Sequence, residues 1–218
     1  MRKEERYRSV IAWFERTMPE AQTELHYGSP FQLLVAVVLS AQCTDRRVNM
    51  VTPGLFSKYP DARSMSQAGA EEIFTLISSI SYPRSKSEHL AGLSRQLMER
   101  WNGEVPQTVE ELQQLPGVGR KTANVVTAVL YNQPNMPVDT HVFRVSNRLG
   151  LTTGSKTPLE TERQLTRHIP PELIPKAHHW LILFGRYVCT ARSPKCESCG
   201  LAEVCRENER KKKDKKLK

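Results

Sequence analysis

The stretch that decides the fold is LPGVGRKTA at residues 115–123, which follows one expected helix and begins another. Two glycines, Gly117 and Gly119, stand on either side of a small apolar residue and allow a tight turn. We expect the backbone N–H groups of this turn to point outward at the N-terminus of the second helix, where they can bind a phosphate group. A simple connection between two helices is the alternative, and further motifs are needed to decide between the two.

The other segments predict further helices and no sheet. No stretch shows sustained alternation of apolar and polar residues with β-branched side chains. Several segments begin with residues that cap helix N-termini. These caps are Ser29 before Pro30, Thr108 with Glu111, Thr157 with Glu160, and Asp139, whose helix would end at Gly150. The expected fold class is therefore all-α.

The formal net charge of +9 is unevenly distributed. Residues 210–218, RKKKDKKLK, hold seven basic residues and one aspartate, so they contribute +6 and leave about +3 (9 − 6) for the other residues. Such a tail can be a solubilising end or a phosphate-binding arm, and its charge does not by itself indicate a nucleic-acid partner. We expect residues 207–218 to be a basic, disordered tail.

The N-terminal segment predicts an intracellular protein. Residues 1–6 are charged and are not followed by the apolar segment of a signal peptide. The longest apolar run, residues 31–41, is too short to cross a bilayer and contains Gln32 and Ser40. We therefore expect this run to be a buried helix, and we expect no association with a membrane.

Four cysteines lie within seventeen residues and indicate a metal centre. They are Cys189, Cys196, Cys199 and Cys205, with the spacing C-x6-C-x2-C-x5-C. Disulfides are disfavoured inside cells. Four thiolates can hold a structural zinc ion, but zinc ribbons usually contain two C-x2-C pairs and this segment has one. A [4Fe-4S] cluster is favoured, with zinc as the alternative. Cys43, which is expected at the end of the apolar helix, is predicted to be a buried or pocket-lining thiol and not a ligand.

Two residues are candidates for catalysis. Lys121 falls in the first turn of the helix after the glycines, where the positive end of the helix dipole favours a neutral, nucleophilic amine. A phosphate contact is the commoner role for a lysine at such a place. Asp139 is expected to cap its helix, and its carboxylate can also stabilise a developing positive charge or activate the lysine.

These motifs together resemble a known family. The strings LPGVGRKTA, VDTHVFR at residues 138–144 and LSAQCTD at residues 39–45, with the cysteine spacing, resemble the helix-hairpin-helix DNA-repair enzymes related to endonuclease III. The resemblance extends from about Leu25 to Cys205. It implies two helical lobes, with damaged double-stranded DNA bound in the cleft between them.

The resemblance also implies how the chain is divided. A helical barrel would occupy residues 23–134, with its helix-hairpin-helix at about 108–131. Residues 1–22 and 135–206 would form the iron–sulfur lobe, with its cluster loop at 189–205. One structural [4Fe-4S] cluster would be held by the four cysteines and would help to present basic residues to DNA.

The implied activity is base excision repair by a bifunctional DNA glycosylase and AP lyase. It would remove oxidised pyrimidines of the thymine glycol type through a Schiff base on Lys121, assisted by Asp139. Cleavage on the 3′ side of the abasic site would follow by β-elimination. The protein would be a cytoplasmic monomer, associated with the nucleoid through DNA, and would need no nucleotide cofactor.

Further residues would contact DNA or the lesion by the same resemblance. Gln42 would fill the space left by the flipped base. The expected DNA contacts are Gly117, Val118, Gly119 and Arg120 of the hairpin, and Arg186, Arg192 and Lys195 near the cluster. The pocket candidates are Ser40, Asp45 and His141.

One segment departs from the family's pattern. Members usually have Gly-Leu-Tyr after an isoleucine, whereas residues 80–86 are ISYPRSK. Tyr82 would replace the leucine that presses on the opposite strand, and its ring can stack on an unpaired base. The altered loop can also weaken duplex opening or change the range of lesions.

Three other functions remain open at this point. An adenine-type monofunctional glycosylase typically lacks a lysine at the position of Lys121. A zinc or redox module would have no catalytic site. A damage sensor would hold abasic sites without turnover, with Lys121 as a phosphate contact only.

Overall fold

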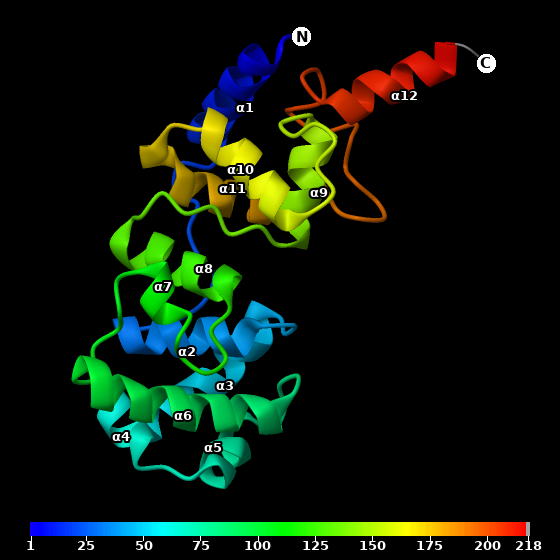
Figure 1. Cartoon of the computed structure of the whole chain (residues 1–218). Coiled ribbons are helices and arrows are strands. Elements are labelled where there is room, and N and C mark those ends of the chain that lie inside the picture. The colour runs from blue at the N-terminus through cyan, green and yellow to red at the C-terminus, as the bar shows by residue number, and fades with distance from the viewer. Residues whose placement is uncertain (217–218) are drawn as a thin grey trace. The chain divides into compact units, whose positions relative to one another are not determined.

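The computed structural model describes residues 1–216, which contain helices and no strand (Figure 1). The expected all-α class is confirmed. The chain divides into two compact units, Met1–Thr23 with Asn132–Lys218, and Glu24–Tyr131. The boundaries therefore fall at 23/24 and 131/132 instead of the expected 22/23 and 134/135. The second one falls earlier because helix α8 (Arg120–Tyr131) ends there.

The unit Glu24–Tyr131 is built around helix α2 (Pro30–Ser40). Ser29 caps this helix by accepting a hydrogen bond from the Gln32 amide, and eight of its eleven residues are buried. The other helices are α3 (Asp45–Lys58), α4 (Ala62–Ser66), α5 (Ala70–Ile77), α6 (Pro83–Trp101), α7 (Val109–Leu112) and α8 (Arg120–Tyr131). Helix α6 packs against α4 and α5, and α2 contacts α3, α6 and α8 (Figure 1). The expected buried helix is thus the centre of this unit.

The other unit combines the two ends of the chain. Its helices are α1 (Lys3–Thr17), α9 (Thr140–Leu149), α10 (Pro158–His168), the short 3-10 helix η1 (Pro171–Leu173), α11 (Ile174–Tyr187) and α12 (Arg206–Lys216). Phe14 of α1 stacks on Trp180 of α11 with ring centres 5.6 Å apart and meets Phe184 edge-on at 5.5 Å. This aromatic cluster joins the N-terminal helix to a helix that lies more than 150 residues later in the sequence.

The expectation of a disordered tail over residues 207–218 is wrong for the described part. Residues 206–216 form α12, and 217–218 lie outside the described residues. The buried Arg6 donates to both carboxylate oxygens of Glu209, at 3.0 and 3.1 Å. Asn208 donates to the Ala202 carbonyl, and Glu207 pairs with Arg210 one turn later. These contacts anchor the first half of the helix, whereas the expectation of disorder rested on the run of basic residues in its second half.

No helix within residues 1–216 is both long and apolar enough to span a bilayer.

We expect Arg6→Met to destabilise the unit that contains α1 and α12. The substitution removes the hydrogen bond from Arg6 to the Val204 carbonyl, at 2.9 Å, and the pair with Glu209. A loss of about 1–3 kcal/mol in the free energy of unfolding is expected, because two half-buried acceptors lose a charged donor. Urea unfolding followed by circular dichroism measures it, with the exposed Arg8→Met as the matched control. Equal stability of the two variants would contradict this role of Arg6.

Candidate functional site

The glycine turn leads directly into α8. The amide of Val118 donates to the Leu115 carbonyl at 3.1 Å, and the amide of Ala123 donates to the Gly119 carbonyl at 3.0 Å. Gly117 has a φ of +76°, in the left-handed region that favours glycine. Val118 is 5% exposed, so it anchors the turn in the core, whereas Gly117, Gly119 and Arg120 are open to solvent.

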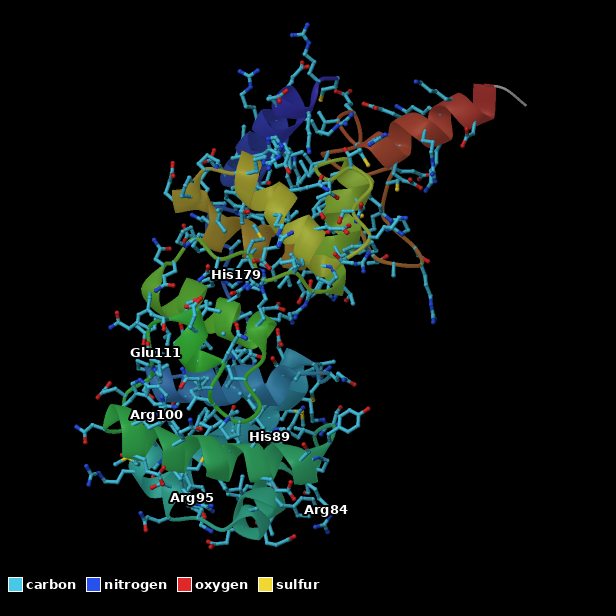
Figure 2. All side chains as sticks on the ribbon, viewed as in Figure 1. Arg84, His89, Arg95, Arg100, Glu111 and His179 are labelled. Atoms are coloured by element: carbon cyan, nitrogen blue, oxygen red, sulfur yellow. The ribbon has the colours of Figure 1, made fainter. Side chains whose placement is uncertain are left out.

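Helix α6 requires a glycine at position 117. A Cβ added to Gly117 would lie 2.9 Å from both Cβ and Nδ1 of His89, which Figure 2 labels on α6. One turn further along α6, a Cβ on Gly92 would lie 3.2 Å from Pro116. The turn therefore rests closely on α6, and its shape is set by packing as well as by its own backbone.

Lys121 and Asp139 lie in different compact units, and each is placed by a helix N-terminus. Lys121 is exposed and is the second residue of α8. Asp139 is half-buried and caps α9, because its Oδ1 accepts from the amides of His141 and Val142 at 2.8 Å each. The capping role expected for Asp139 is confirmed. The two hydrogen bonds fix the direction of the carboxylate at the start of the helix.

The two residues expected to enter the opened duplex share an unusual backbone conformation. Gln42 and Tyr82 have φ values of 53° and 55°, and both are exposed, Tyr82 to 65%. Gln42 lies between α2 and α3, and Tyr82 immediately precedes α6. Both side chains thus project from turns at the surface of one unit.

The three pocket candidates already have local contacts. The Ser40 hydroxyl donates to the Val37 carbonyl at 2.8 Å, within its own helix. Asp45 is the half-buried first residue of α3. His141 Nδ1 lies 3.2 Å from Nη2 of Arg144. Ser40 and Asp45 belong to one unit and His141 to the other.

The four cysteines come together in the cluster loop. All four line one pocket, together with apolar residues such as Phe184 and Val188. Cys196 is exposed and the other three are half-buried. Within residues 1–216 no three metal-binding side chains are grouped closely enough to hold a single ion. Four cysteines that line one pocket supply the four thiolates that a [4Fe-4S] cluster takes.

Burial disfavours the thiolate form of two of the four cysteines. Burial is the main cause that raises the pKa of Cys199 and of Cys205, because an apolar surrounding disfavours the thiolate. Iron bound to all four sulfurs would offset that cost. The residues present therefore fit a [4Fe-4S] cluster in chemistry as well as in number.

Two arginines of α9 that were not predicted from the sequence hold the start of the cluster loop. Arg148 donates to the carbonyls of Thr190 and Ala191 at 2.7 and 2.9 Å, and its Nη1 lies 3.6 Å from Cys189 Sγ. Arg144 donates to the carbonyls of Gly185 and Cys189. Their four-residue spacing, which places both on one helix face, was the available signal.

The three basic residues near the cluster that are expected to contact DNA lie on this loop or just before it. Arg186 is half-buried in the last turn of α11, and Arg192 and Lys195 are exposed on the loop itself. The amide of Lys195 donates to the Val188 carbonyl at 3.0 Å, which holds the loop close to the end of α11.

Comparison with known proteins decides the family. Residues 35–171 match the HhH-GPD superfamily of base excision DNA repair proteins, and residues 189–205 match the iron–sulfur binding domain of endonuclease III. The chain belongs to the endonuclease III family. It is 48% identical to endonuclease III of Bacillus subtilis, covering 91% of this chain and 90% of that protein. Against endonuclease III of Escherichia coli K12 the identity is 42%, covering 92% and 95%.

Solved structures of endonuclease III agree with this assignment. The structure of a trapped endonuclease III–DNA covalent intermediate matches with a TM-score of 0.91 at 44% identity, covering 97% of this chain and all of that one. A non-covalent endonuclease III–DNA complex matches equally well, with a TM-score of 0.91.

Membership of the endonuclease III family confirms several predictions. The chain is a base-excision-repair enzyme of the DNA glycosylase and AP lyase class. Its resident cofactor is one [4Fe-4S] cluster, so the zinc alternative is wrong.

We expect Gly117→Ala to distort the hairpin. The new Cβ would meet His89, and a non-glycine residue in the left-handed region is strained, at a cost of about 1–3 kcal/mol. Thermal unfolding measures this loss. Gly119→Ala is the control, since no atom lies within 4 Å of a Cβ there and its φ is not positive. A Gly117→Ala variant as stable as the control would show that the turn can rearrange freely.

We expect Arg148→Met to weaken retention of the cluster. The substitution frees two loop carbonyls and removes a donor near Cys189, and loss of such supporting contacts costs about 10- to 100-fold in metal affinity. Iron and sulfide content after incubation with a chelator, with visible absorbance, measure the effect. Arg192→Met changes an exposed arginine of the same loop and should retain the cluster. Similar iron loss in both variants would count against a specific role for Arg148.

Proposed function

We propose that the chain removes oxidised pyrimidines of the thymine glycol type from double-stranded DNA and then cuts the strand on the 3′ side. The observation that carries this proposal is Lys121, an exposed lysine in the first turn of α8, directly after the exposed glycine turn. A turn that binds a backbone phosphate would place the lysine amine beside the sugar of the lesion.

The proposed chemistry begins at the sugar. The Lys121 amine attacks C1′ of the lesion nucleotide, the glycosidic bond breaks, and the departing base takes the bonding electrons and then a proton. The amine loses protons and the sugar ring opens, so that an imine joins Nζ to C1′. Removal of a proton from C2′ then expels the 3′ phosphate, and water finally releases Lys121. The trapped covalent endonuclease III–DNA intermediate supports a covalent route of this kind.

Asp139 is proposed to assist from the N-terminus of α9. Its carboxylate would stabilise positive charge as the base departs and would accept a proton from the attacking amine. The two amides on Oδ1 fix the direction of the carboxylate, so that little reorganisation is needed during the reaction.

The DNA would be held largely through its backbone. Gly117, Gly119 and Arg120 of the hairpin, and Arg192 and Lys195 of the cluster loop, are all exposed and suited to phosphate contacts. Gln42 would fill the gap left by the flipped base, and Tyr82 would stack on the opposite strand. The cluster supplies no redox step here, and its role is to give the loop a fixed shape.

We further propose that the protein acts as a monomer at the nucleoid in the cytoplasm. Damaged double-stranded DNA would be its partner, as DNA is in the solved endonuclease III complexes. The alternative, a sensor that holds abasic sites without turnover, would need Lys121 for phosphate contact only.

Borohydride trapping tests the proposal. On a duplex with one thymine glycol, the protein should form a covalent adduct, and Lys121→Gln should reduce the adduct and strand cleavage to background. Arg120→Gln, the neighbouring exposed cation, should weaken DNA binding and still form the adduct. Asp139→Asn, which keeps a capping side chain, should slow base removal about 100-fold.

The outcomes separate the candidates. No adduct from folded, cluster-loaded protein would overturn the lyase proposal for this lesion. An adduct that persists in Lys121→Gln would place the nucleophile elsewhere. Tight binding to abasic DNA without cleavage, equally weakened by Lys121→Gln and Arg120→Gln, would favour the sensor.

A further inference from the structure

The turn that carries Gln42 has a defined and unusual geometry. Ala41 has φ −58° and ψ 116°, Gln42 has φ 53°, and the Cys43 amide donates to the Ser40 carbonyl at 3.0 Å. These values describe a type II β-turn, whose third residue needs a positive φ and is normally glycine or asparagine. Glutamine at this position requires an additional interaction to hold the turn.

Tyr82 has the same left-handed backbone, with φ 55° and ψ 51°. Within residues 1–216, four non-glycine residues have positive φ, and two of them are asparagines, which tolerate it. The other two are Gln42 and Tyr82, the residues that the proposed function places in the opened duplex. Unfavourable backbone conformations persist where the surrounding structure holds them and where function requires them.

Lys86 contacts the backbone of both turns. It lies one turn into α6, is 6% exposed, and donates from Nζ to the carbonyls of Leu39 and Ala41 at 2.8 and 2.6 Å. Its own amide donates to the Tyr82 carbonyl at 3.1 Å. The amide bond is the first backbone hydrogen bond of α6 and does not depend on the side chain, so it is the ammonium group of Lys86 that ties the start of α6, next to Tyr82, to the turn of Gln42.

The bond to Ala41 decides which turn forms. Types I and II differ mainly by a rotation of the central peptide, which reverses its carbonyl and changes the sign of φ at the third residue. In this turn the central peptide joins Ala41 to Gln42. An ammonium group bonded to the Ala41 carbonyl therefore favours type II, and with it the positive φ of Gln42.

Nearby groups partly offset the cost of burying the Lys86 ammonium group. Burial is the main cause that lowers the pKa of Lys86, and the nearby Cys43 acts in the opposite direction. Leu39 and Ala41 lie at the C-terminal end of α2, where carbonyls lack partners within the helix and the dipole favours a cation. An apolar residue of similar length would fill the same space without the cost of desolvation, so the ammonium group requires a reason beyond packing.

We propose that Lys86 is a positioning residue that holds Gln42 and Tyr82 in one rigid arrangement, ready to enter the duplex together. This inference rests on the proposed function, because it assigns both side chains to duplex opening. Lys86 itself touches neither DNA nor the reacting atoms. Its contribution is to fix both turns before binding, so that the cost of ordering them is not met during base flipping.

The test compares two substrates. Lys86→Met removes the ammonium group and keeps most of the volume, Lys86→Arg keeps a cationic donor, and Lys58→Met changes an exposed lysine of the same unit. For each, we would measure single-turnover excision of paired thymine glycol and strand cleavage at a preformed abasic site. Fluorescence of 2-aminopurine opposite the lesion reports unstacking of the duplex, and circular dichroism reports folding.

Lys86→Met should slow excision of the paired lesion by about tenfold or more, because small misplacements at a site are costly. Cleavage at the abasic site should fall by less than about threefold, since a missing base needs less opening. The fluorescence rise should be reduced in Lys86→Met, largely restored in Lys86→Arg and normal in Lys58→Met.

Wild-type excision by Lys86→Met, or equal losses on both substrates, would overturn the inference and leave Lys86 a structural residue. If Lys86→Met does not fold, Lys86→Gln takes its place under the same criteria. Failure of the unaltered protein to excise or cleave would instead count against the proposed function. In that case the fluorescence change would still show whether Lys86 controls duplex opening.

Discussion

The burial of α2 is the constraint on which the unit Glu24–Tyr131 depends. An apolar helix of eleven residues has to be covered on nearly all sides, and α3, α6 and α8 contact it. Burial of its side chains removes a large apolar area from water. Asp45 and Lys121 lie in the first turns of α3 and α8, and Tyr82 immediately precedes α6, so packing on one helix sets the directions of several candidate site residues.

Helix α9 has a comparable place in the other unit. Asp139 caps its N-terminus, while Arg144 and Arg148 hold the first residues of the cluster loop. The helix also contacts α10, α11 and α12. A short helix of ten residues thus connects the candidate catalytic carboxylate to the metal centre, and the cluster can support the site mechanically without taking part in the reaction.

Features that depend on nearby residues, such as helix caps, could be predicted from the sequence. Contacts between residues far apart in the chain could not. Ser29, Thr108, Thr157 and Asp139 cap helices as expected, because capping depends on residues two or three positions away. The contacts of Lys86 with Ala41 and of Arg6 with Glu209 join residues 45 and 203 positions apart. No local pattern marks such pairs. The helical tail and the link between the turns of Gln42 and Tyr82 therefore emerged only from the structure.

The order of the chain also has a consequence for biosynthesis. Tyr7 bonds to the Leu151 carbonyl and Arg6 to Val204 and Glu209, so α1 does not have all its partners until residue 209 has left the ribosome. Residues 24–131 form a continuous unit and can fold first. Until residue 205 emerges the fourth thiol is missing, so the cluster cannot gain its full set of ligands before the whole cluster loop has been synthesised.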